Sequence, residues 1–321
     1  MIKSMTVVNA SDEALTITLN EPEPQHGLLI TNIDGLGPAK AKVNVTERAT
    51  TDGSVYNSAR LETRNIVISL LFTFAPTIED SRQLTYRFFP IKKDITLFFE
   101  TDNRVVYCTG YVETNTPSIF SKTEGAQISI ICPDPYFYDA INGNNQTQFS
   151  GVEPLFHFPF NNTHEVIETS YDPETYGERT IVTKQPMVMG NIFMLTQATI
   201  DYYGDSDVGV IFTLHALGTV RNVSLYNIDT RGYMFIDTDK LEQLTGRGFV
   251  AGDDIIINTN TGFKAVTLLR DGHETNILNC VNRDADWFRL IKGSNRIAFS
   301  AEEGNENIIM TSFNDIIYEG I

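Results

Sequence analysis

Short runs in which apolar and polar residues alternate with a period of two recur along most of this chain. In one of them Ile95, Leu97 and Phe99 are each separated by a single residue. A β-strand places successive side chains on opposite faces, so this period predicts strands with one buried face. The other runs are Ala14–Leu19, Leu28–Ile33, Ala41–Glu47, Asn65–Phe74, Arg104–Glu113, Ala126–Cys132, Arg179–Lys184, Val208–His215, Thr219–Tyr226, Asp254–Asn258, Phe263–Arg270 and Arg296–Phe299. We therefore expect a mainly β protein.

Pairs that contain glycine separate several of these runs. Asp271-Gly272 stands between two of them, and an Asp-Gly pair there favours a tight hairpin because both residues tolerate positive φ. The pairs Asp34-Gly35, Asp52-Gly53 and Asn142-Gly143 are further turn signals.

Only two helices are expected. The first begins after Thr77, which can cap it, and is stopped by Pro90. The second is shorter, runs near Asp237–Leu244 and ends at Gly246.

Composition narrows the class of protein. Of 321 residues 41% are hydrophobic, which is ample for a packed core, and no apolar run is long enough to span a membrane. The start of the sequence carries no secretory signal, so we expect intracellular synthesis. With 24 Lys and Arg against 41 Asp and Glu the net charge is −17, which disfavours specific binding of nucleic acid.

The sequence contains no motif of catalysis, cofactor binding or metal binding. Phosphate-binding loops, dinucleotide fingerprints and nucleophile elbows are all missing. His164 to Glu168 resembles the zinc motif HExxH, but Glu168 replaces its second histidine. We therefore expect no enzyme, no cofactor and no metal. An enzyme that hydrolyses cell-wall polysaccharides would need two carboxylates facing each other in a cleft, and nothing in the sequence favours such a pair.

The three cysteines are odd in number and have no CxxC spacing. Cys108, Cys132 and Cys280 lie among apolar, strand-like neighbours, and we expect buried free thiols.

A polar, turn-rich segment, Asp139–Gln146, divides the chain. It predicts two domains, residues 1–140 and residues 141–321. In the second domain Tyr202, Tyr203 and Trp287 are candidates for a surface on which a sugar could stack, although a single Trp in a sandwich usually belongs to the core.

The order of several motifs resembles one known family. In the first half they lie at Ile33–Gly37, Thr51–Ser54, Arg64–Ile68, Arg82–Pro90, Ile95–Phe99, Arg104, Gly110–Glu113 and Gln127–Phe137. In the second half they lie at Asp201–Asp205, Gly252–Ile257, Asp286–Leu290 and Gly293–Asn295. The first half resembles the N-terminal domain of the siphophage distal tail protein (Dit), and the second resembles the C-terminal domain of many such proteins.

The resemblance implies a fold and a function. The expected fold is an N-terminal split-barrel or β-sandwich-like ring domain with one helix, followed by a C-terminal galectin-like β-sandwich. Six copies would form a ring at the tip of the phage tail, after synthesis in the cytoplasm of the bacterial host. This hexameric hub would connect the tail tube protein to a tail-tip hub protein and to receptor-binding proteins, and DNA would pass through its centre.

The residues that match the family carry no chemistry, and we expect them to determine the fold. They are Gly53, Arg64, Gly110, Pro133, Asp134, Tyr136, Gly252 and Asp253. Gly53 would supply positive φ in a turn, and Pro133 would help to end the last strand of the domain.

Two expectations concern contacts with other molecules. The stretch Gly35–Arg64 has few large apolar residues and is expected to form an extended hairpin that reaches a neighbouring subunit. The alternative to the tail hub is a carbohydrate-binding protein that contacts the host cell wall through the second domain.

Overall fold

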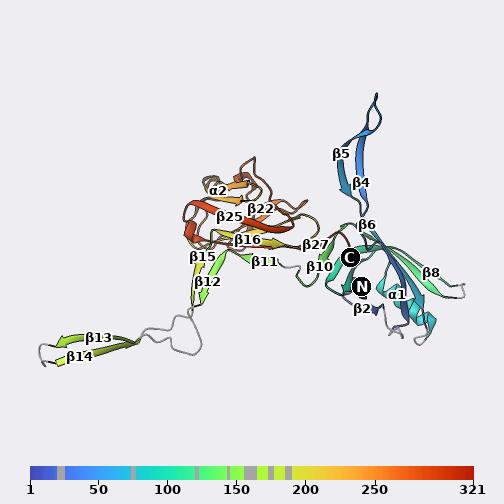
Figure 1. Cartoon of the computed structure of the whole chain (residues 1–321), viewed down its shortest axis with the longest axis horizontal. Helices are drawn as coiled ribbons and strands as arrows, with labels where there is room; N and C mark the ends of the chain where they lie inside the picture. The colour runs from blue at the N-terminus through green and yellow to red at the C-terminus, as the bar shows by residue number, and fades with distance from the viewer. Residues whose placement is uncertain are drawn as a thin grey trace.

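The computed structural model describes residues 1–19, 26–73, 77–119, 123–142, 145–154, 165–172, 177–184 and 190–321. It is mainly β and contains two bodies, each with its own hydrophobic core (Figure 1). The expectation of a mainly β protein is thus confirmed. Within these residues no helix is long and apolar enough to cross a membrane.

The first body is built on a sheet of nine strands. Seven of them follow the order β2-β1-β7-β8-β9-β6-β3, and β10 and β27 pair at its side. The strands are β1 (Ile2–Val8), β2 (Ala14–Thr18), β3 (Leu28–Asp34), β6 (Arg64–Phe72), β7 (Asp94–Thr101), β8 (Val105–Ser118), β9 (Gly125–Cys132), β10 (Phe137–Asp139) and β27 (Ile317–Tyr318). Burial alternates along β7, where Ile95, Leu97 and Phe99 are all buried. The period of two therefore places the core as the sequence predicted; Phe74, the last residue of one expected run, lies outside the described residues.

Both helices form where the sequence predicted them. In α1 (Ile78–Phe88) the Thr77 side chain accepts a hydrogen bond from the Asp80 N–H, and the helix ends before Pro90. In α2 (Thr238–Thr245) Asp237 caps the start, and Gly246 closes the end in the left-handed conformation. In both helices an oxygen of the capping side chain satisfies an N–H that the first turn leaves unpaired.

A two-stranded hairpin, β4 (Ala41–Glu47) with β5 (Ser54–Leu61), projects from the first body (Figure 1). Its residues are exposed along nearly the whole length. Gly53 has a φ of 91° in the turn that joins the strands, as the sequence predicted. The expectation of an extended hairpin within Gly35–Arg64 is confirmed, and its contact with a neighbouring subunit stays a prediction.

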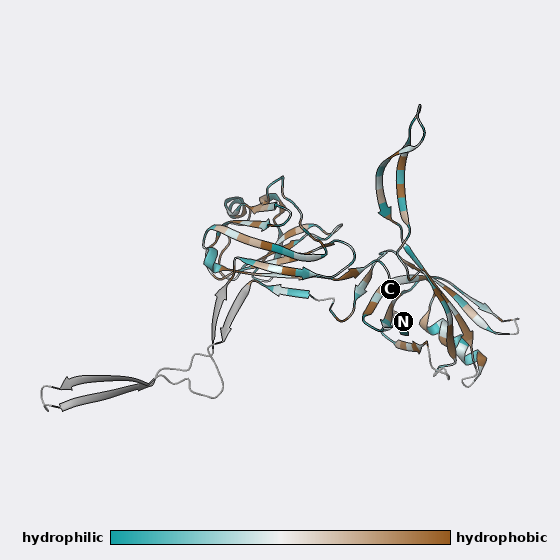
Figure 2. Ribbon diagram, viewed as in Figure 1, coloured by the Kyte–Doolittle hydropathy of each residue, from teal (hydrophilic) through white to brown (hydrophobic). Residues whose placement is uncertain are grey.

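The second body packs two antiparallel sheets against each other. One has the order β11-β26-β18-β21-β22-β23 and the other β16-β25-β19-β20, with β17 and β24 as an added pair. The strands are β11 (Asn145–Gln148), β16 (Gln197–Tyr202), β17 (Val208–Gly209), β18 (Ile211–Ala216), β19 (Arg221–Asn227), β20 (Gly232–Ile236), β21 (Asp254–Asn258), β22 (Ala265–Arg270), β23 (His273–Asn276), β24 (Arg289–Leu290), β25 (Gly293–Glu303) and β26 (Ile308–Asn314). Two 3-10 turns lie at Leu278–Cys280 and Asn305–Asn307. Hydropathy alternates along these strands (Figure 2). The sandwich is confirmed, and its likeness to galectins stays a prediction.

The turn between β22 and β23 has the predicted form. Asp271 and Gly272 both have positive φ, 51° and 78°. This is the backbone of a tight hairpin whose twist matches that of the flanking strands.

Two further hairpins lie between β11 and β16. In the first, β12 (Ser150–Pro154) pairs with β15 (Gly190–Met194), and in the second β13 (Glu165–Asp172) pairs with β14 (Gly177–Lys184). The HExxH-like stretch therefore continues into a strand at Glu165, while His164 lies outside the described residues.

The two bodies are joined twice. The chain leaves the first sheet after β10 and enters the second body at β11, and it returns at its C-terminal end, where β27 pairs with β10. Ile317 packs in the second core, Tyr318 packs against both cores, and Ile321 packs against the first. The boundary expected at residue 140 stays a prediction.

All three cysteines are buried and free, as expected. Cys108 and Cys132 belong to the first core, and Cys280 belongs to the second.

The first testable prediction concerns Gly35, which follows β3 with a φ of 89°. A Cβ there would lie 2.0 Å from the backbone oxygen of Asn65. We expect Gly35→Ala to lower the free energy of unfolding by at least about 2 kcal/mol, because strain and a backbone clash add. Urea denaturation followed by circular dichroism measures it. Gly37→Ala is the matched control, since a Cβ at Gly37 meets nothing within 4 Å; equal losses in both variants would contradict the prediction.

Candidate functional site

The β4–β5 hairpin has one apolar face and one polar face. Val45 pairs across the strands with Tyr56, and Val43 pairs with Ala59 on the same face. Val43, Val45 and Tyr56 are 53%, 52% and 63% exposed. Figure 2 shows the hydrophobic positions along the projecting strands. Because two strands alone are marginally stable in water, an apolar face of this kind favours a contact with another protein.

The opposite face of the hairpin is internally hydrogen-bonded. Asn44 Nδ2 donates to Ser58 Oγ at 3.0 Å, and Asn57 Nδ2 donates to Thr46 Oγ1 at 2.6 Å. These bonds fix the register of the two strands, so the apolar face keeps one orientation.

At the root of the hairpin lies Arg64, a buried arginine bonded to backbone carbonyls. Its side chain donates to the oxygens of Pro135 (2.8 Å), Gly35 (2.6 Å), Gly37 (2.6 Å) and Glu319 (2.6 Å). It is only 2% exposed, and none of the ion pairs of the described chain includes it. Burial lowers the pKa of the guanidinium. A single side chain thus holds the hairpin root, the segment after β9 and the C-terminal end.

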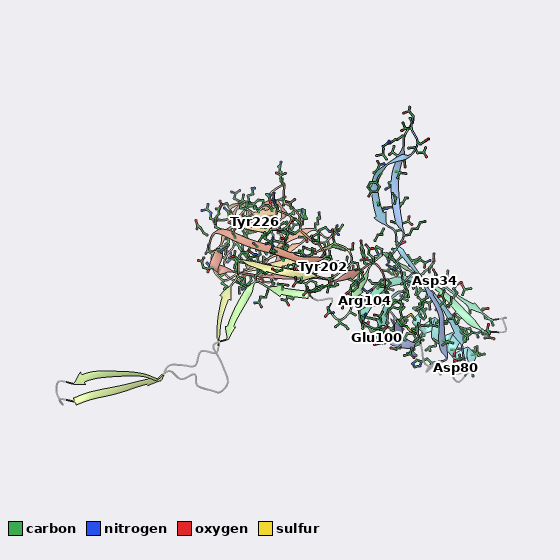
Figure 3. The ribbon with its side chains drawn as sticks, viewed as in Figure 1. Asp34, Asp80, Glu100, Arg104, Tyr202 and Tyr226 are labelled. Carbon is green, nitrogen blue, oxygen red and sulfur yellow. The ribbon has the colours of Figure 1, made fainter. Side chains whose placement is uncertain are left out.

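The ring of Phe137 completes this cluster. The Arg64 guanidinium carbon lies 4.2 Å from the ring centroid, a cation–π distance. A second arginine repeats the arrangement: Arg104 stands 4.3 Å from the Tyr318 ring centroid and donates to the Gly320 oxygen at 3.2 Å. Figure 3 places Arg104 on the side of the first body that faces the second. Both arginines therefore bind the C-terminal residues to the first body.

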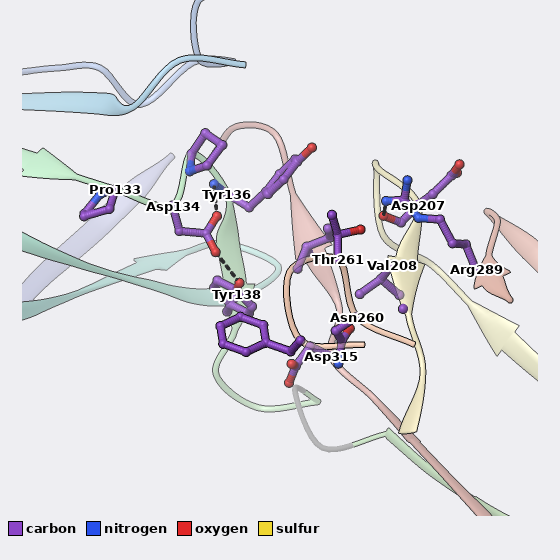
Figure 4. A pocket seen from close by; sticks show the side chains of 14 residues that line it. Pro133, Asp134, Tyr136, Tyr138, Asp207, Val208, Asn260, Thr261, Arg289 and Asp315 are labelled. Carbon is purple, nitrogen blue, oxygen red and sulfur yellow. Dashed lines mark hydrogen bonds between the residues drawn. The ribbon is translucent and has the colours of Figure 1, made fainter. Parts of the chain in front are cut away.

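Other residues expected to determine the fold lie in structural contacts. A Cβ at Gly110 would stand 2.7 Å from Cys132 Sγ. Strand β9 ends at Cys132, directly before Pro133. Asp134 accepts from the Tyr136 N–H and from the Tyr138 hydroxyl (Figure 4).

Gly252 and Asp253 form a turn before β21. Gly252 has a φ of 87°. The buried Asp253 accepts two hydrogen bonds from Arg270, at 2.8 and 2.6 Å, and one from the Val250 N–H. Burial alone would raise the pKa of Asp253, but the bonds from Arg270 and Val250 outweigh it and hold the pKa below its usual range. The ion pair between Asp253 and Arg270 therefore links the turn before β21 to the end of β22.

The three aromatic candidates for sugar contact do not share a surface. Tyr202 is fully buried, and its hydroxyl donates to the Ser206 oxygen at 2.7 Å, so its prediction as a sugar contact is wrong. The reason is the strand period: Ile200 and Tyr202 point into the core, and the next residue, Tyr203, is 66% exposed. Trp287 is half-buried against the second core, with Lys264 Nζ 5.4 Å from its ring centroid.

A cleft of about 560 Å³ lies between the two bodies, and the sequence analysis did not predict it (Figure 4). The first body lines it with Asp134 and Tyr136. The second lines it with Asn260 and Phe263, from the turn between β21 and β22, and with Asp315, which follows β26. No motif marks a site assembled from positions so far apart in the sequence. Elsewhere in the described ranges, no cluster of three or more His, Cys, Asp or Glu side chains could hold a metal ion.

No family model matches this chain, and no curated protein matches it in sequence. Solved structures that are similar to it include hub and baseplate proteins of phages. One is the crystal structure of the SPP1 Dit (gp 19.1) protein, described as a paradigm of the hub adsorption apparatus in phages that infect Gram-positive bacteria. The TM-score is 0.56 at 11% identity, covering 98% of this chain and 99% of that one.

Two structures of the phage P2 baseplate, in its activated conformation with Ca and with Sr, have TM-scores of 0.42 and 0.41 at 12% identity. They cover 100% and 97% of this chain, and the same shares of their own chains. The expected resemblance to siphophage distal tail proteins is confirmed at the level of the fold by the SPP1 protein.

The second testable prediction concerns Arg64. We expect Arg64→Met to lower the free energy of unfolding by about 3 kcal/mol or more, because several buried carbonyl oxygens lose their donor. Urea denaturation of the purified chain measures the loss. Arg60→Met, in the exposed hairpin, is the control and should stay within about 0.5 kcal/mol of the wild type. A small loss of stability in Arg64→Met would contradict the prediction, because it would show that water donates to these carbonyl oxygens in place of the guanidinium.

The third prediction is a pH dependence at Asp253. Its pKa is lowered in the folded chain, so the Arg270 pair stabilises the fold fully above the unfolded value of about 4. That contribution disappears as the pH falls through the folded pKa. We therefore expect the stability gap between wild type and Asp253→Asn to be large at neutral pH and to shrink near pH ~3.

Urea midpoints at both pH values test this dependence. Asp271→Asn is the control, since Asp271 is 79% exposed in its pair with Arg247 and its gap should be small throughout. A gap for Asp253→Asn that stays constant with pH would contradict the prediction.

Proposed function

We propose that this chain is a structural hub of a long, non-contractile phage tail, and that six copies close into a ring. In this proposal the ring continues the tail tube, joins it to the tail-tip hub protein and to receptor-binding proteins, and lets DNA pass through its centre. The protein is synthesised in the cytoplasm of the bacterial host, functions in the virion and performs no catalysis. The fold shared with the SPP1 hub protein supports this role.

The single observation that carries the proposal is the projecting hairpin. Its apolar face stays exposed, while its polar face and its root are held by specific hydrogen bonds. A hairpin that is held in one position but whose apolar face is uncovered is typical of a surface that another subunit covers. In this proposal the hairpin of each copy binds a different surface on the next copy. Such a head-to-tail contact produces a ring when the rotations between successive copies add up to a full turn.

Charge favours a second copy as the partner. The whole chain carries −17, yet residues 41–61 contain three basic side chains (Lys42, Arg48, Arg60) and two acidic ones (Glu47, Asp52). The hairpin is therefore a slightly positive part of an acidic protein. An acidic neighbour attracts it, whereas the acidic remainder repels the phosphates of passing DNA.

The fourth testable prediction is the mass in solution. We expect light scattering near physiological salt to give six times the 36.0 kDa mass of one chain, or twice that value for two stacked rings. Val45→Asp places a charge on the apolar face and should shift the mass toward the monomer.

Val55→Asp is the matched control. Val55 pairs with Thr46 on the opposite face and is 44% exposed, so the same substitution there should leave the ring intact. A wild-type monomer at all concentrations, or equal effects of the two variants, would overturn the role of the hairpin.

A further inference from the structure

The cleft between the two bodies has aromatic walls on opposite sides. Tyr136 comes from the segment after β9, and its hydroxyl accepts from Ser206 Oγ at 3.3 Å. Phe263 comes from the turn between β21 and β22 and is 74% exposed, so its ring has almost no protein contact. Among the Phe side chains that the structure describes, Phe263 is the only exposed one, and a large exposed aromatic ring at the rim of a concave site is unusual.

Several polar groups in the cleft have unused hydrogen-bonding capacity. Among the described residues no hydrogen bond or ion pair involves the carboxyl of Asp315, the side-chain amide of Asn260 or the hydroxyl of Thr261. Arg289 uses one donor, on the Asp207 oxygen at 2.6 Å, and keeps the others. Asp315 is half-buried, and burial raises the pKa of its carboxyl. A half-buried acid without a donor is costly for the fold unless something else satisfies it.

The walls of the cleft are fixed by packing. A Cβ at Gly209 would lie 2.4 Å from the Asn260 Cα, so glycine at that position lets the Asn260 turn lie directly against β17. On the other side, Asp134 fixes Tyr138 and the backbone of Tyr136 by two hydrogen bonds (Figure 4). The groups that face the cleft are therefore held in place before any ligand arrives, which reduces the entropic cost of binding.

We infer that this cleft binds a neutral saccharide, with one sugar ring against Phe263 and its hydroxyls bonded to Asn260, Thr261 and Asp315. A sugar offers an apolar C–H face for an aromatic ring, and hydroxyls that both donate and accept. The lining supplies the matching set: carboxylate acceptors, an amide and a hydroxyl that do both, and guanidinium donors. This inference is separate from the hub role, and either can fail alone.

The charges of the cleft decide against other ligand classes. Three carboxylates, Asp134, Asp207 and Asp315, face one guanidinium, Arg289, so a phosphate or another anion is repelled. A polyamine would need acceptors only, and Arg289 would stand against it. A neutral ligand that uses donors and acceptors together is the one that satisfies every free group.

The fifth testable prediction is saccharide binding by the full-length protein. Maltotriose, cellotriose and N,N′,N″-triacetylchitotriose are tested separately by saturation-transfer NMR, and Kd is obtained by titration. We expect at least one to bind, and Phe263→Ala to weaken its binding about fivefold or more. Asp315→Asn, which keeps the size of the side chain, should also weaken it.

Tyr111→Ala is the matched control, because Tyr111 is an aromatic residue of the first body that is 50% exposed and does not line the cleft. Its Kd should equal that of the wild type. Circular dichroism melts confirm that each variant is folded. Absence of saturation transfer with all three sugars at millimolar concentration overturns the inference. So does binding that survives Phe263→Ala, or spermine binding that Asp315→Asn abolishes while no sugar binds.

Discussion

A buried charge without a carboxylate partner organises this protein. The Arg64 guanidinium has lost its water, and a buried charge is tolerated only when hydrogen bonds replace the hydration shell. Here the replacement comes from backbone carbonyls of three segments, including Glu319 at the far end of the sequence. These segments must meet at one point for the charge to be satisfied. The start of the hairpin, the exit from the first sheet and the return of the C-terminal end are therefore set together.

The cleft is a consequence of the same constraint. Because β27 pairs with β10 and Tyr318 donates to Asp139, the chain crosses between the bodies twice and cannot swing on a single linker. Turns of the second body then stand opposite the segment around Asp134, and the space between them becomes a cleft with fixed walls.

The features that the sequence predicts correctly are those that depend on residues close together in the chain. The period of two, the Thr77 cap, the helix end at Gly246 and the Asp271-Gly272 turn each depend on residues a few positions apart, and each forms as expected. Sequence reasoning failed at Tyr202, because one Tyr in a strand gives no sign of which face is buried until the register is known. Arg64 stood out only through the family resemblance, and its partners could not be foreseen because they are backbone carbonyls, which every residue has. The cleft was missed for a related reason: Asp134, Asn260 and Asp315 meet only through the fold.

The hairpin shows why assembly surfaces resist prediction even when the element itself is foreseen. Val43 and Val45 alternate with polar residues as in any half-buried strand, and such a pattern usually places the apolar face against the protein's own core. In the structure no core lies behind that face. This apolar face would be buried only if another molecule supplied a second layer over it. The hydrogen bonds on the polar face hold the two strands together without that layer, so the apolar face is already formed in the isolated chain.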